Sequence, residues 1–335
     1  MKKYLNVLRY LLFLGAGALL LWLSFRKQSF SLVWDKIRHA DPYWIGLSVA
    51  LGFAALVIRA IRWKQLIEPL GYATRGTSTY HAVMIGYLAN MAIPRLGEIT
   101  RCGALSKSEK VPFDKLVGTV IVERVSDVLF LLISILFVAV LESGMLSGFL
   151  LAQVVNPILQ LMQEHPILIV LLLALMCGGI LLMVYLFRMK NPPAVISKMI
   201  ALVKGILEGL KSIRRLKNKP LFFFYSCAIW IIYLFMTYVC FFAMPATSHL
   251  SIGAGLVVTV LGGIGMTAPV QGGIGVYHLL VSQGLILYGL SDTDGIAFAM
   301  LVHTTQTLML IILGFISLLA MFFTKPKPSA IHESF

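Results

Sequence analysis

Long apolar runs recur along the chain, and most of the charged residues fall between them. Each run is close to the roughly 20 residues that a helix needs to cross a ~30 Å hydrocarbon core. Apolar and polar positions do not alternate within the runs, which excludes a transmembrane strand barrel. The pattern predicts six crossing helices, at residues 5–25, 43–67, 116–141, 166–187, 221–243 and 297–323.

The composition supports the same class of protein. Of the 335 residues, 59% are hydrophobic and only 13% are charged, whereas an ordinary soluble domain carries about 25% charged residues. We predict an all-α polytopic membrane protein, with one integral membrane domain over residues 1–323 and a short tail over 324–335. Lys2 and Lys3 precede the first run, as they would in a signal peptide. No small-residue cleavage site follows, so this run is predicted to remain as the first helix.

The charges of the loops predict an orientation. Residues 188–220 contain nine Lys or Arg residues and one acid, which places them in the cytoplasm by the positive-inside rule. The tail carries Lys325 and Lys327, so both termini are predicted to be cytoplasmic in a cell membrane. The formal net charge of +14 therefore indicates orientation and anionic lipid rather than nucleic acid. The segments without Lys or Arg are predicted to be external: 142–165, 244–250 and 291–296.

Two apolar stretches do not fit as single crossings. Both flanks of residues 78–94 look cytoplasmic, so this stretch is predicted to be a re-entrant hairpin. The flank before it contains Arg59, Arg62, Lys64 and Arg75, and the flank after it, 95–115, contains five basic residues. Residues 251–290 lie between two external segments and form either a broken pair of helices or two full crossings. Segment 26–41 is basic, yet it must be external for the crossings to alternate.

Proline and glycine interrupt both of these stretches, at "IPRLGE" (93–98) and "APVQGGIGVYH" (268–278). One break falls in each predicted half of the chain, 1–141 and 166–323. Such paired breaks are typical of inverted repeats that meet at a central transport site, where non-helical backbone must be buried or line a wet cavity. The alternative is two kinked helices in a compact bundle. The predicted break residues are Pro94, Gly97, Pro269, Gly272, Gly273 and Gly275.

Between the halves, residues 193–217 have apolar positions at helical spacing together with six basic residues. This pattern predicts an amphipathic helix on the cytoplasmic leaflet. A soluble connecting helix packed on the bundle is the alternative.

Charged residues near the first break form a pattern of alternating sign. Glu98 and Arg101 are three residues apart, and Glu123, Arg124 and Asp127 follow near the start of the 116–141 run. Because each would cost at least ~2.5 kcal/mol in lipid at mid-depth, they should face one another or a cavity. One hypothesis is a set of salt bridges that holds helices together. The other is a polar pocket for a lipid head group, in which arginines pair with a phosphate.

Other chemistry has little support in the sequence. His81, His278 and His303 are scattered, and the four cysteines show no metal-ligand spacing. There is no GxSxG or Walker motif, and the extramembrane loops are too short for a catalytic domain. We predict no catalytic residues, no metal and no cofactor.

Three segments carry a resemblance to a known family: "GYLANMAIPRLGEITRCGAL" (86–105), "VERVSDVLFLL" (122–132) and "APVQGGIGVYH". They resemble the signature regions of the flippase-like family, the transmembrane region of lysylphosphatidylglycerol synthases, over nearly the whole chain. In bifunctional synthases this resemblance implies a module that moves aminoacylated phosphatidylglycerol between leaflets. Stand-alone relatives, including some linked to polyprenyl-phosphate sugars, mostly have no assigned substrate. Together with the charge pattern, the resemblance implies these substrate-binding residues: Asn90, Arg95, Glu98, Arg101, Glu123, Arg124 and Asp127. His278 is also predicted to bind substrate, because it directly follows the second break.

The chain departs from the family in two respects. An acidic residue usually follows the glycine-rich break, where this chain has His278. The aminoacyl-transferase domain is expected to be absent, so the chain should not synthesise lysylphosphatidylglycerol by itself.

The predicted function is translocation of a phospholipid or another lipid-linked anionic substrate between leaflets, without nucleotide hydrolysis. One alternative is an intramembrane enzyme that acts on a lipid-linked substrate, with Glu98 or Glu123 as acid or base. Another is an accessory subunit of a lipid-modifying system. The expected partners are membrane lipids with anionic head groups, not nucleic acid, and either a second copy of the chain or a lipid-modifying enzyme.

Overall fold

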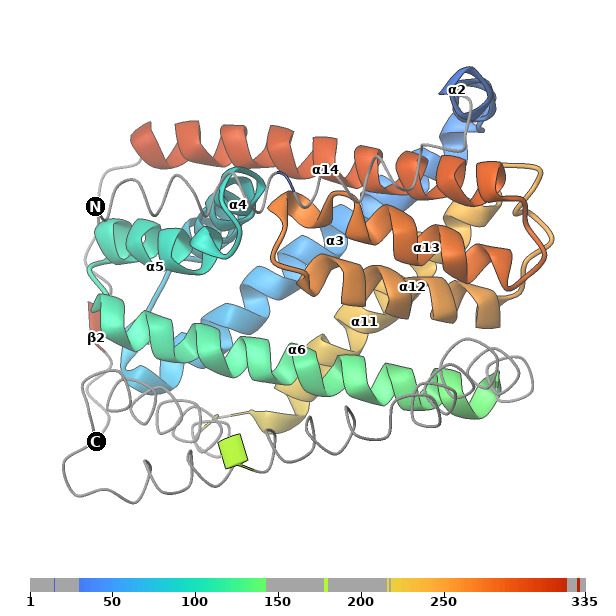
Figure 1. Ribbon diagram of the computed structural model, residues 1–335. Coiled ribbons are helices and arrows are strands. Elements are labelled where there is room, and N and C mark those ends of the chain that lie inside the picture. Colours follow the sequence, from blue (N-terminus) through green and yellow to red (C-terminus); the bar gives the residue numbers. More distant parts are fainter. Residues whose placement is uncertain are drawn as a thin grey trace.

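The computed structural model describes residues 30–142 and 218–323, together with residues 15, 178–179, 216 and 330–331. A short helix, α2 (Phe30–Arg38), is followed by two groups of four helices, and each group has the order long, short, short, long. The first group comprises α3 (Pro42–Ile67), α4 (Gly76–Ala92), α5 (Leu96–Glu109) and α6 (Phe113–Leu141). The second comprises α11 (Lys219–Phe241), α12 (Ile252–Thr267), α13 (Val276–Ile286) and α14 (Asp292–Phe323) (Figure 1).

Four crossing helices predicted from the apolar runs are confirmed. The helices α3, α6, α11 and α14 are each long and apolar enough to cross a membrane, and they cover the runs predicted at 43–67, 116–141, 221–243 and 297–323. The protein is thus an all-α polytopic membrane protein. The predicted crossings 5–25 and 166–187 and the amphipathic segment 193–217 lie outside the described residues, apart from isolated positions.

Short polar sequences start several of these helices. The Asp41 carboxylate accepts a hydrogen bond from the Tyr43 backbone N–H (2.8 Å), and proline occupies the first position of α3. The side chains of Asn218 and Ser251 cap α11 and α12 in the same way. These side chains satisfy N–H groups that the first helical turn leaves without a partner.

The four short helices of the described residues form two hairpins, and each helix is too short to cross a membrane by itself. At 1.5 Å per residue, α4 (17 residues) is about 26 Å long, α5 (14) about 21 Å, α12 (16) about 24 Å and α13 (11) about 17 Å. None of them spans a ~30 Å hydrocarbon core as a straight helix. The prediction of a hairpin within residues 78–94 is wrong in its bounds, because these residues lie almost entirely in the single helix α4 and the hairpin is formed by α4 with α5, which lies in the predicted flank 95–115. Residues 251–290 form a broken pair of helices, α12 and α13, with η4 between them.

The loops gather at two opposite ends of the bundle. At one end, Arg75 before α4 pairs with Glu109 at the end of α5 (2.7 Å). At the other, Lys36 of α2 pairs with Asp294 of α14 (2.6 Å), and the Asp41 N–H donates to the Ala243 carbonyl (2.8 Å). Segment 30–41 therefore lies at the same end as 244–250 and 291–294, as the alternation of crossings requires. The short strands β1 (Tyr72–Ala73) and β2 (Ala330–Ile331) pair antiparallel.

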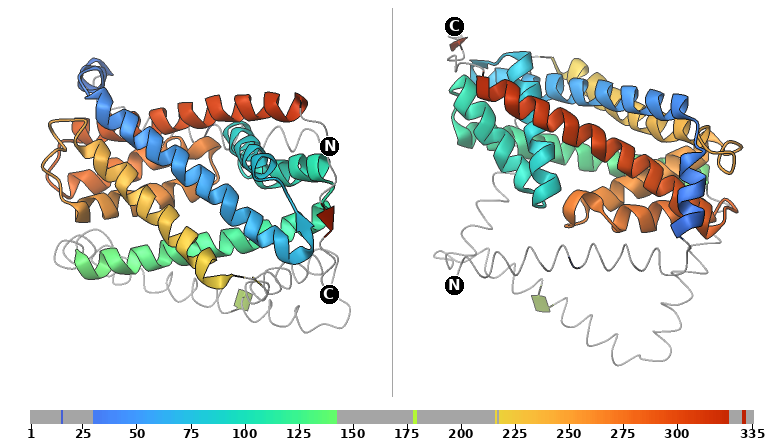
Figure 2. Two further views of the ribbon diagram at one scale, coloured as in Figure 1. Left: turned by 180° about the vertical axis from the view of Figure 1, so that it is seen from behind. Right: turned by 90° about the horizontal axis from the view of Figure 1, so that it is seen from above.

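The two groups of helices are inverted relative to each other. Ser48 of α3 bonds to the Met236 carbonyl of α11 (3.0 Å), and Arg62 of α3 bonds to Ser226 of α11 (3.1 Å). The positions rise along α3 as they fall along α11, so the two helices are antiparallel. Figures 1 and 2 show that α6 and α14 also run in opposite directions. The fold therefore has the inverted arrangement that the paired breaks predicted.

The two chain breaks meet inside the bundle. The sulfur of Met91, near the end of α4, lies 2.9 Å from the position that a Cβ on Gly272 would occupy. Gly272 belongs to the single turn η4 (Gln271–Gly273), which interrupts the second hairpin. Figure 1 shows the corresponding ends of α4 and α13 facing each other.

Candidate functional site

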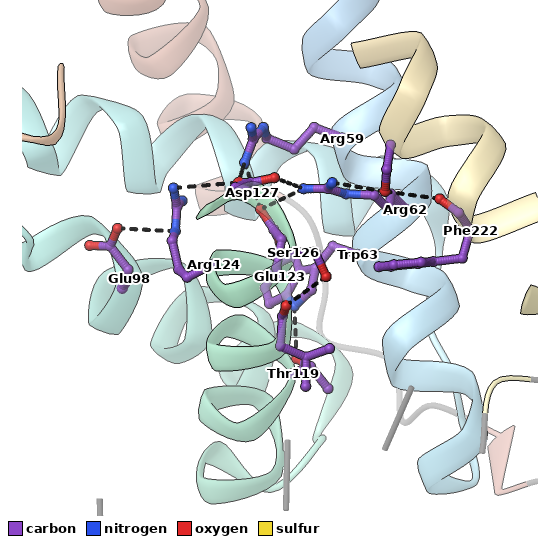
Figure 3. Close-up of polar contacts among 12 residues, drawn as sticks. Arg59, Arg62, Trp63, Glu98, Thr119, Glu123, Arg124, Ser126, Asp127 and Phe222 are labelled. Carbon is purple, nitrogen blue, oxygen red and sulfur yellow. Dashed lines mark hydrogen bonds and ion pairs between the residues drawn. The ribbon is translucent and has the colours of Figure 1, made fainter. Parts of the chain in front are cut away.

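Residues of four helices form one buried charge network, shown in Figure 3. Glu123 of α6 is at its centre and is fully buried. Its Oε1 accepts a hydrogen bond from Arg59 (2.8 Å) and its Oε2 accepts one from Arg101 (3.0 Å). The Arg101 guanidinium also lies 4.7 Å from the Trp63 ring centroid, a cation–π geometry. Both Glu123 oxygens are thereby held by arginines from α3 and α5.

Asp127, one turn further along α6, is the second centre. Its carboxylate accepts hydrogen bonds from Arg59 (2.8 Å) and Arg62 (2.6 Å), and Arg124 Nη1 lies 3.8 Å away. The remaining nitrogens of the two α3 arginines reach α11: Arg59 donates to the Tyr233 hydroxyl and Arg62 to the Ser226 hydroxyl, both at 3.1 Å. The network therefore connects both groups of helices.

Burial divides this network into an inner and an outer part. Arg59, Arg62, Arg101 and Glu123 are at most 4% exposed. The outer part is the ion pair between Arg124 Nε and Glu98 Oε1 at 3.5 Å, where the side chains are 42% and 28% exposed. A separation of 3.5 Å is long for a hydrogen bond. Only the outer pair is placed to meet a molecule from the surroundings.

An apolar groove of about 400 Å³ lies between α5 and α6 beside this outer pair. Apart from Glu98 and Arg124, its walls are aliphatic. Ile99, Val128 and Leu129 are about half exposed at its edge, so the groove opens on the outside of the bundle. The lining residues are Glu98, Ile99, Val117, Val120, Ile121, Arg124, Val125, Val128 and Leu129.

Positive charge exceeds negative charge in the network. Four arginines face three carboxylates, so about twenty N–H donors face roughly twelve acceptor positions. Among the described residues, Arg101 Nε and Nη2 and Arg124 Nε have no hydrogen-bond partner. Buried unpaired donors cost free energy, and among the same described residues the acceptor Glu98 Oε2 is also unpaired.

The first break is a tight backbone arrangement. Arg95 precedes α5 with a left-handed φ of 63°. The carboxamide oxygen of Asn90 accepts a hydrogen bond from the Gly97 N–H (2.7 Å). A Cβ on Gly97 would lie 2.1 Å from the Gly86 carbonyl oxygen, so only glycine fits there. Asn90 therefore closes the turn between α4 and α5 and takes no part in the charge network.

The second break has no charged side chains. Gly272, Gly273 and Gly275 all have positive φ angles, which glycine adopts without strain. His278 is 3% exposed, and its Nδ1 accepts a hydrogen bond from the Gly275 N–H (3.3 Å). His303 of α14 donates from Nε2 to the Gly272 carbonyl (2.7 Å), and its ring centroid is 4.7 Å from that of His278. The two histidines hold the shape of this break.

The structure brings together five of the eight predicted substrate-binding residues: Glu98, Arg101, Glu123, Arg124 and Asp127. Asn90 and His278 instead cap the two breaks. Arg95 is exposed at the tip of the first hairpin and has no ion-pair partner among the described residues.

The sequence interpretation missed Arg59 and Arg62. It placed them in a basic cytoplasmic flank, which is wrong, because both lie within α3 and are buried. Their three-residue spacing inside the apolar run 43–67 was the available signal, since it puts both on one helix face. A search of the described residues finds no cluster of three metal-ligating side chains.

Comparison with known proteins places the chain in a family. The model of the lysylphosphatidylglycerol synthase TM region matches residues 6–314. Over 103 residues, 30% of this chain and 31% of the relative, the chain is 34% identical to the UPF0104 membrane protein MJ1595 of Methanocaldococcus jannaschii. Over 94 residues, 28% of this chain and 15% of the relative, it is 24% identical to "Glycosyltransferase AglD" of Haloferax volcanii.

These matched segments span less than a third of either relative. No solved structure matches the chain. Because the family model covers nearly its whole length, the chain belongs to the lysylphosphatidylglycerol synthase TM region family.

Proposed function

We propose that this protein moves a phospholipid or another lipid-linked anionic substrate between membrane leaflets, without nucleotide hydrolysis. The observation that carries this proposal is the position of Arg124. Its side chain is 42% exposed and lines an apolar groove, and its buried Nε lies 3.5 Å from Glu98. A phosphate can replace this long contact with bidentate hydrogen bonds.

The groove suits the rest of a lipid molecule. Its aliphatic walls open at the outside of the bundle, so acyl chains would stay in contact with lipid while the head group binds the outer ion pair. The excess of arginines over carboxylates favours an anionic head group over a neutral one. Transport would be driven by the lipid gradient or by consumption of the lipid on one side.

The test is movement of fluorescent phosphatidylglycerol across proteoliposome membranes. We expect Arg124→Gln to slow this movement at least about tenfold, because a lost charge-assisted hydrogen bond weakens binding by ~1.5–3 kcal/mol. Arg124→Lys should recover part of the rate, since a point charge attracts phosphate without the fork geometry. Arg38→Gln is the matched control, because Arg38 is 58% exposed on α2 and pairs only with Asp35. Folded Arg124→Gln protein that moves the lipid at the unmodified rate would contradict the proposal.

An intramembrane enzyme is the second candidate, because one relative is named a glycosyltransferase. Glu123 is poorly suited to acid–base chemistry, since both of its oxygens are bonded to buried arginines. Glu98 is the carboxylate on the groove wall, and its Oε2 has no partner among the described residues. Mass spectrometry of the lipids after the transport assay separates the candidates. Unchanged lipid supports translocation, and a lipid of altered mass supports the enzyme.

A further inference from the structure

The two inverted helix groups correspond residue by residue. Gly86 and Gly262 are both the eleventh residue of their helices, α4 and α12. A Cβ on Gly86 would meet Arg101, the sixth residue of α5, and a Cβ on Gly262 would meet Val281, the sixth residue of α13. The two hairpins are therefore closed by the same contact.

The breaks follow the same correspondence. Arg95 directly precedes α5 with φ 63°, and Gly275 directly precedes α13 with φ 85°. Both residues adopt a positive φ, although only one of them is a glycine. Two independent features, a close helix contact and a backbone angle, thus give one alignment of the two halves.

In this alignment the outer ion pair has a counterpart. Glu98 and His278 are each the third residue after their break, and Arg124 and His303 are each the twelfth residue of the following long helix. Glu98 contacts Arg124, and His278 contacts His303. Both pairs lie about 16 Å along α6 or α14 from its first residue, roughly half of a hydrocarbon core.

The two pairs differ in access. The side chains of Glu98 and Arg124 are 28% and 42% exposed beside the groove, whereas His278 and His303 are 3% and 7% exposed. The groove runs along residues 117–129 of α6, on both sides of Arg124, and the start of α6 lies at one end of the bundle. The start of α14 lies at the opposite end. The first hairpin is thus open beside its long helix, while the second is closed against its own.

We infer that the His278–His303 pair is a second binding site for the anionic head group, which becomes accessible from the opposite leaflet when the two halves exchange conformations. The inference rests on the proposed function and adds a second site to it. In the exchanged state a groove opens between α13 and α14, as one is open between α5 and α6 here, and the groove between α5 and α6 closes. An imidazole freed from its contacts at the break can offer an N–H to a phosphate oxygen. The two breaks themselves meet where Met91 approaches Gly272.

The test uses a double variant that keeps the backbone contacts of both histidines. Asn at 278 retains an acceptor where Nδ1 accepts from Gly275, and Gln at 303 retains a donor where Nε2 donates to Gly272. His278→Asn/His303→Gln should therefore fold normally, as thermal unfolding in detergent would verify. His81→Gln is the matched control, because His81 bonds Ser317 between α4 and α14, outside both pairs.

Transport of fluorescent phosphatidylglycerol is measured in vesicles selected for one protein orientation, with the labelled lipid added to either leaflet. We expect the double variant to raise the half-saturating lipid density about tenfold on the side of the bundle where α14 starts and to leave the other side unchanged. Arg124→Gln should raise the half-saturating lipid density on the side where α6 starts and leave it unchanged on the side where α14 starts. The variant His278→Glu/His303→Arg places the charged pair of the first half, Glu98 and Arg124, at the corresponding positions of the second half. It should restore tight lipid binding. Its fold should be kept, since Glu at the third position of a helix retains the capping contact.

The outcomes distinguish the inference from the proposed function. Unmodified protein that moves no lipid contradicts the function. Unmodified protein that transports, together with a folded double variant whose half-saturating density is unchanged on both sides, contradicts only the inference. Equal loss on both sides also contradicts it, because a structural role of the histidines would affect both directions alike.

Discussion

The two halves of this protein build the same architecture with different interiors. In the first half, the sixth residue of α5 and the eleventh of α6 are Arg101 and Glu123, which form a buried ion pair. In the second half, the corresponding residues of α13 and α14 are Val281 and Val302, both buried in an apolar cluster. The same long, short, short, long arrangement therefore forms with and without charges.

This difference bears on what the charges do. Replacing a buried ion pair by well-packed apolar residues is often neutral or stabilising, and the second half is an example of such an interior within the same chain. The charge network of the first half is thus not needed to build the fold. Under the proposed function, the network lies beside the open groove because it serves recognition of an anionic head group.

The largest effect is expected from breaking the ion pair on one side. Glu123→Val introduces the residue of the second half but leaves Arg101 without its carboxylate and Arg59 with one fewer partner. An uncompensated buried charge costs about 3–5 kcal/mol. Denaturant unfolding in detergent should show a loss of that size.

The double variant Arg101→Val/Glu123→Val tests whether the first half tolerates the apolar interior. Arg59 and Arg62 keep Asp127 as a partner, so removing both charges should recover at least half of the loss caused by Glu123→Val. If the double variant is as unstable as the single one, the ion pair has a structural role that the second half does not need.

The next effect concerns the glycines that bring the hairpin helices together. A Cβ on Gly97 would overlap the Gly86 carbonyl and the Asn90 side chain, whereas a Cβ on Gly103 in the same helix meets nothing within 4 Å. We expect Gly97→Ala to lower the stability by ~1–3 kcal/mol, as overpacking does, and Gly103→Ala to be neutral or slightly stabilising. Thermal unfolding of the two variants measures the contrast. Equal stability would mean that α5 can move away from α4 at no cost.

Hydrophobic pattern alone was sufficient for much of the fold. Runs of apolar residues fix where a chain can cross a membrane, and proline with glycine fixes where it cannot continue as a helix, so α3, α6, α11, α14 and both breaks could be predicted. The tertiary partners of the charged residues could not be predicted in this way. Arg59 looks like a loop charge when read along the chain, and only the packing of α3 against α6 shows that its partners are Glu123 and Asp127.

The alignment of the halves is a second property that the sequence conceals. His278 resembles neither Glu98 nor any other acid, and Val281 does not resemble Arg101. Their equivalence follows from backbone features, namely a positive φ before each helix and a glycine contact at the same position. Backbone geometry is the same in both halves although the side chains have diverged.

A smaller effect should follow from removing the side chains that close the two breaks. Asn90 accepts the Gly97 N–H at 2.7 Å, and His278 accepts the Gly275 N–H at the weaker distance of 3.3 Å. We expect Asn90→Ala to cost about 1–2 kcal/mol, because it leaves a half-buried N–H unpaired, while Asn90→Asp retains the acceptor. Amide hydrogen exchange of residues 93–97 should accelerate in Asn90→Ala only. Unchanged exchange would show that the turn is held by packing alone.

The smallest expected change in stability concerns Arg95, and it is the one that separates stability from function most clearly. Arg95 occupies a left-handed conformation at φ 63°, which costs a non-glycine residue about 1 kcal/mol, and its side chain is exposed without an ion-pair partner among the described residues. The second half has glycine at the corresponding position. Arg95→Gly should therefore raise the free energy of unfolding slightly, by up to about 1 kcal/mol.

The transport rate of the same variant tests whether Arg95 contacts an anionic head group at the tip of the hairpin. If it does, Arg95→Gly should transport phosphatidylglycerol more slowly although it is more stable. The rate of Arg95→Lys should lie between those of Arg95→Gly and the unmodified protein. A protein that gains stability and keeps its full transport rate would remove Arg95 from the substrate-binding residues.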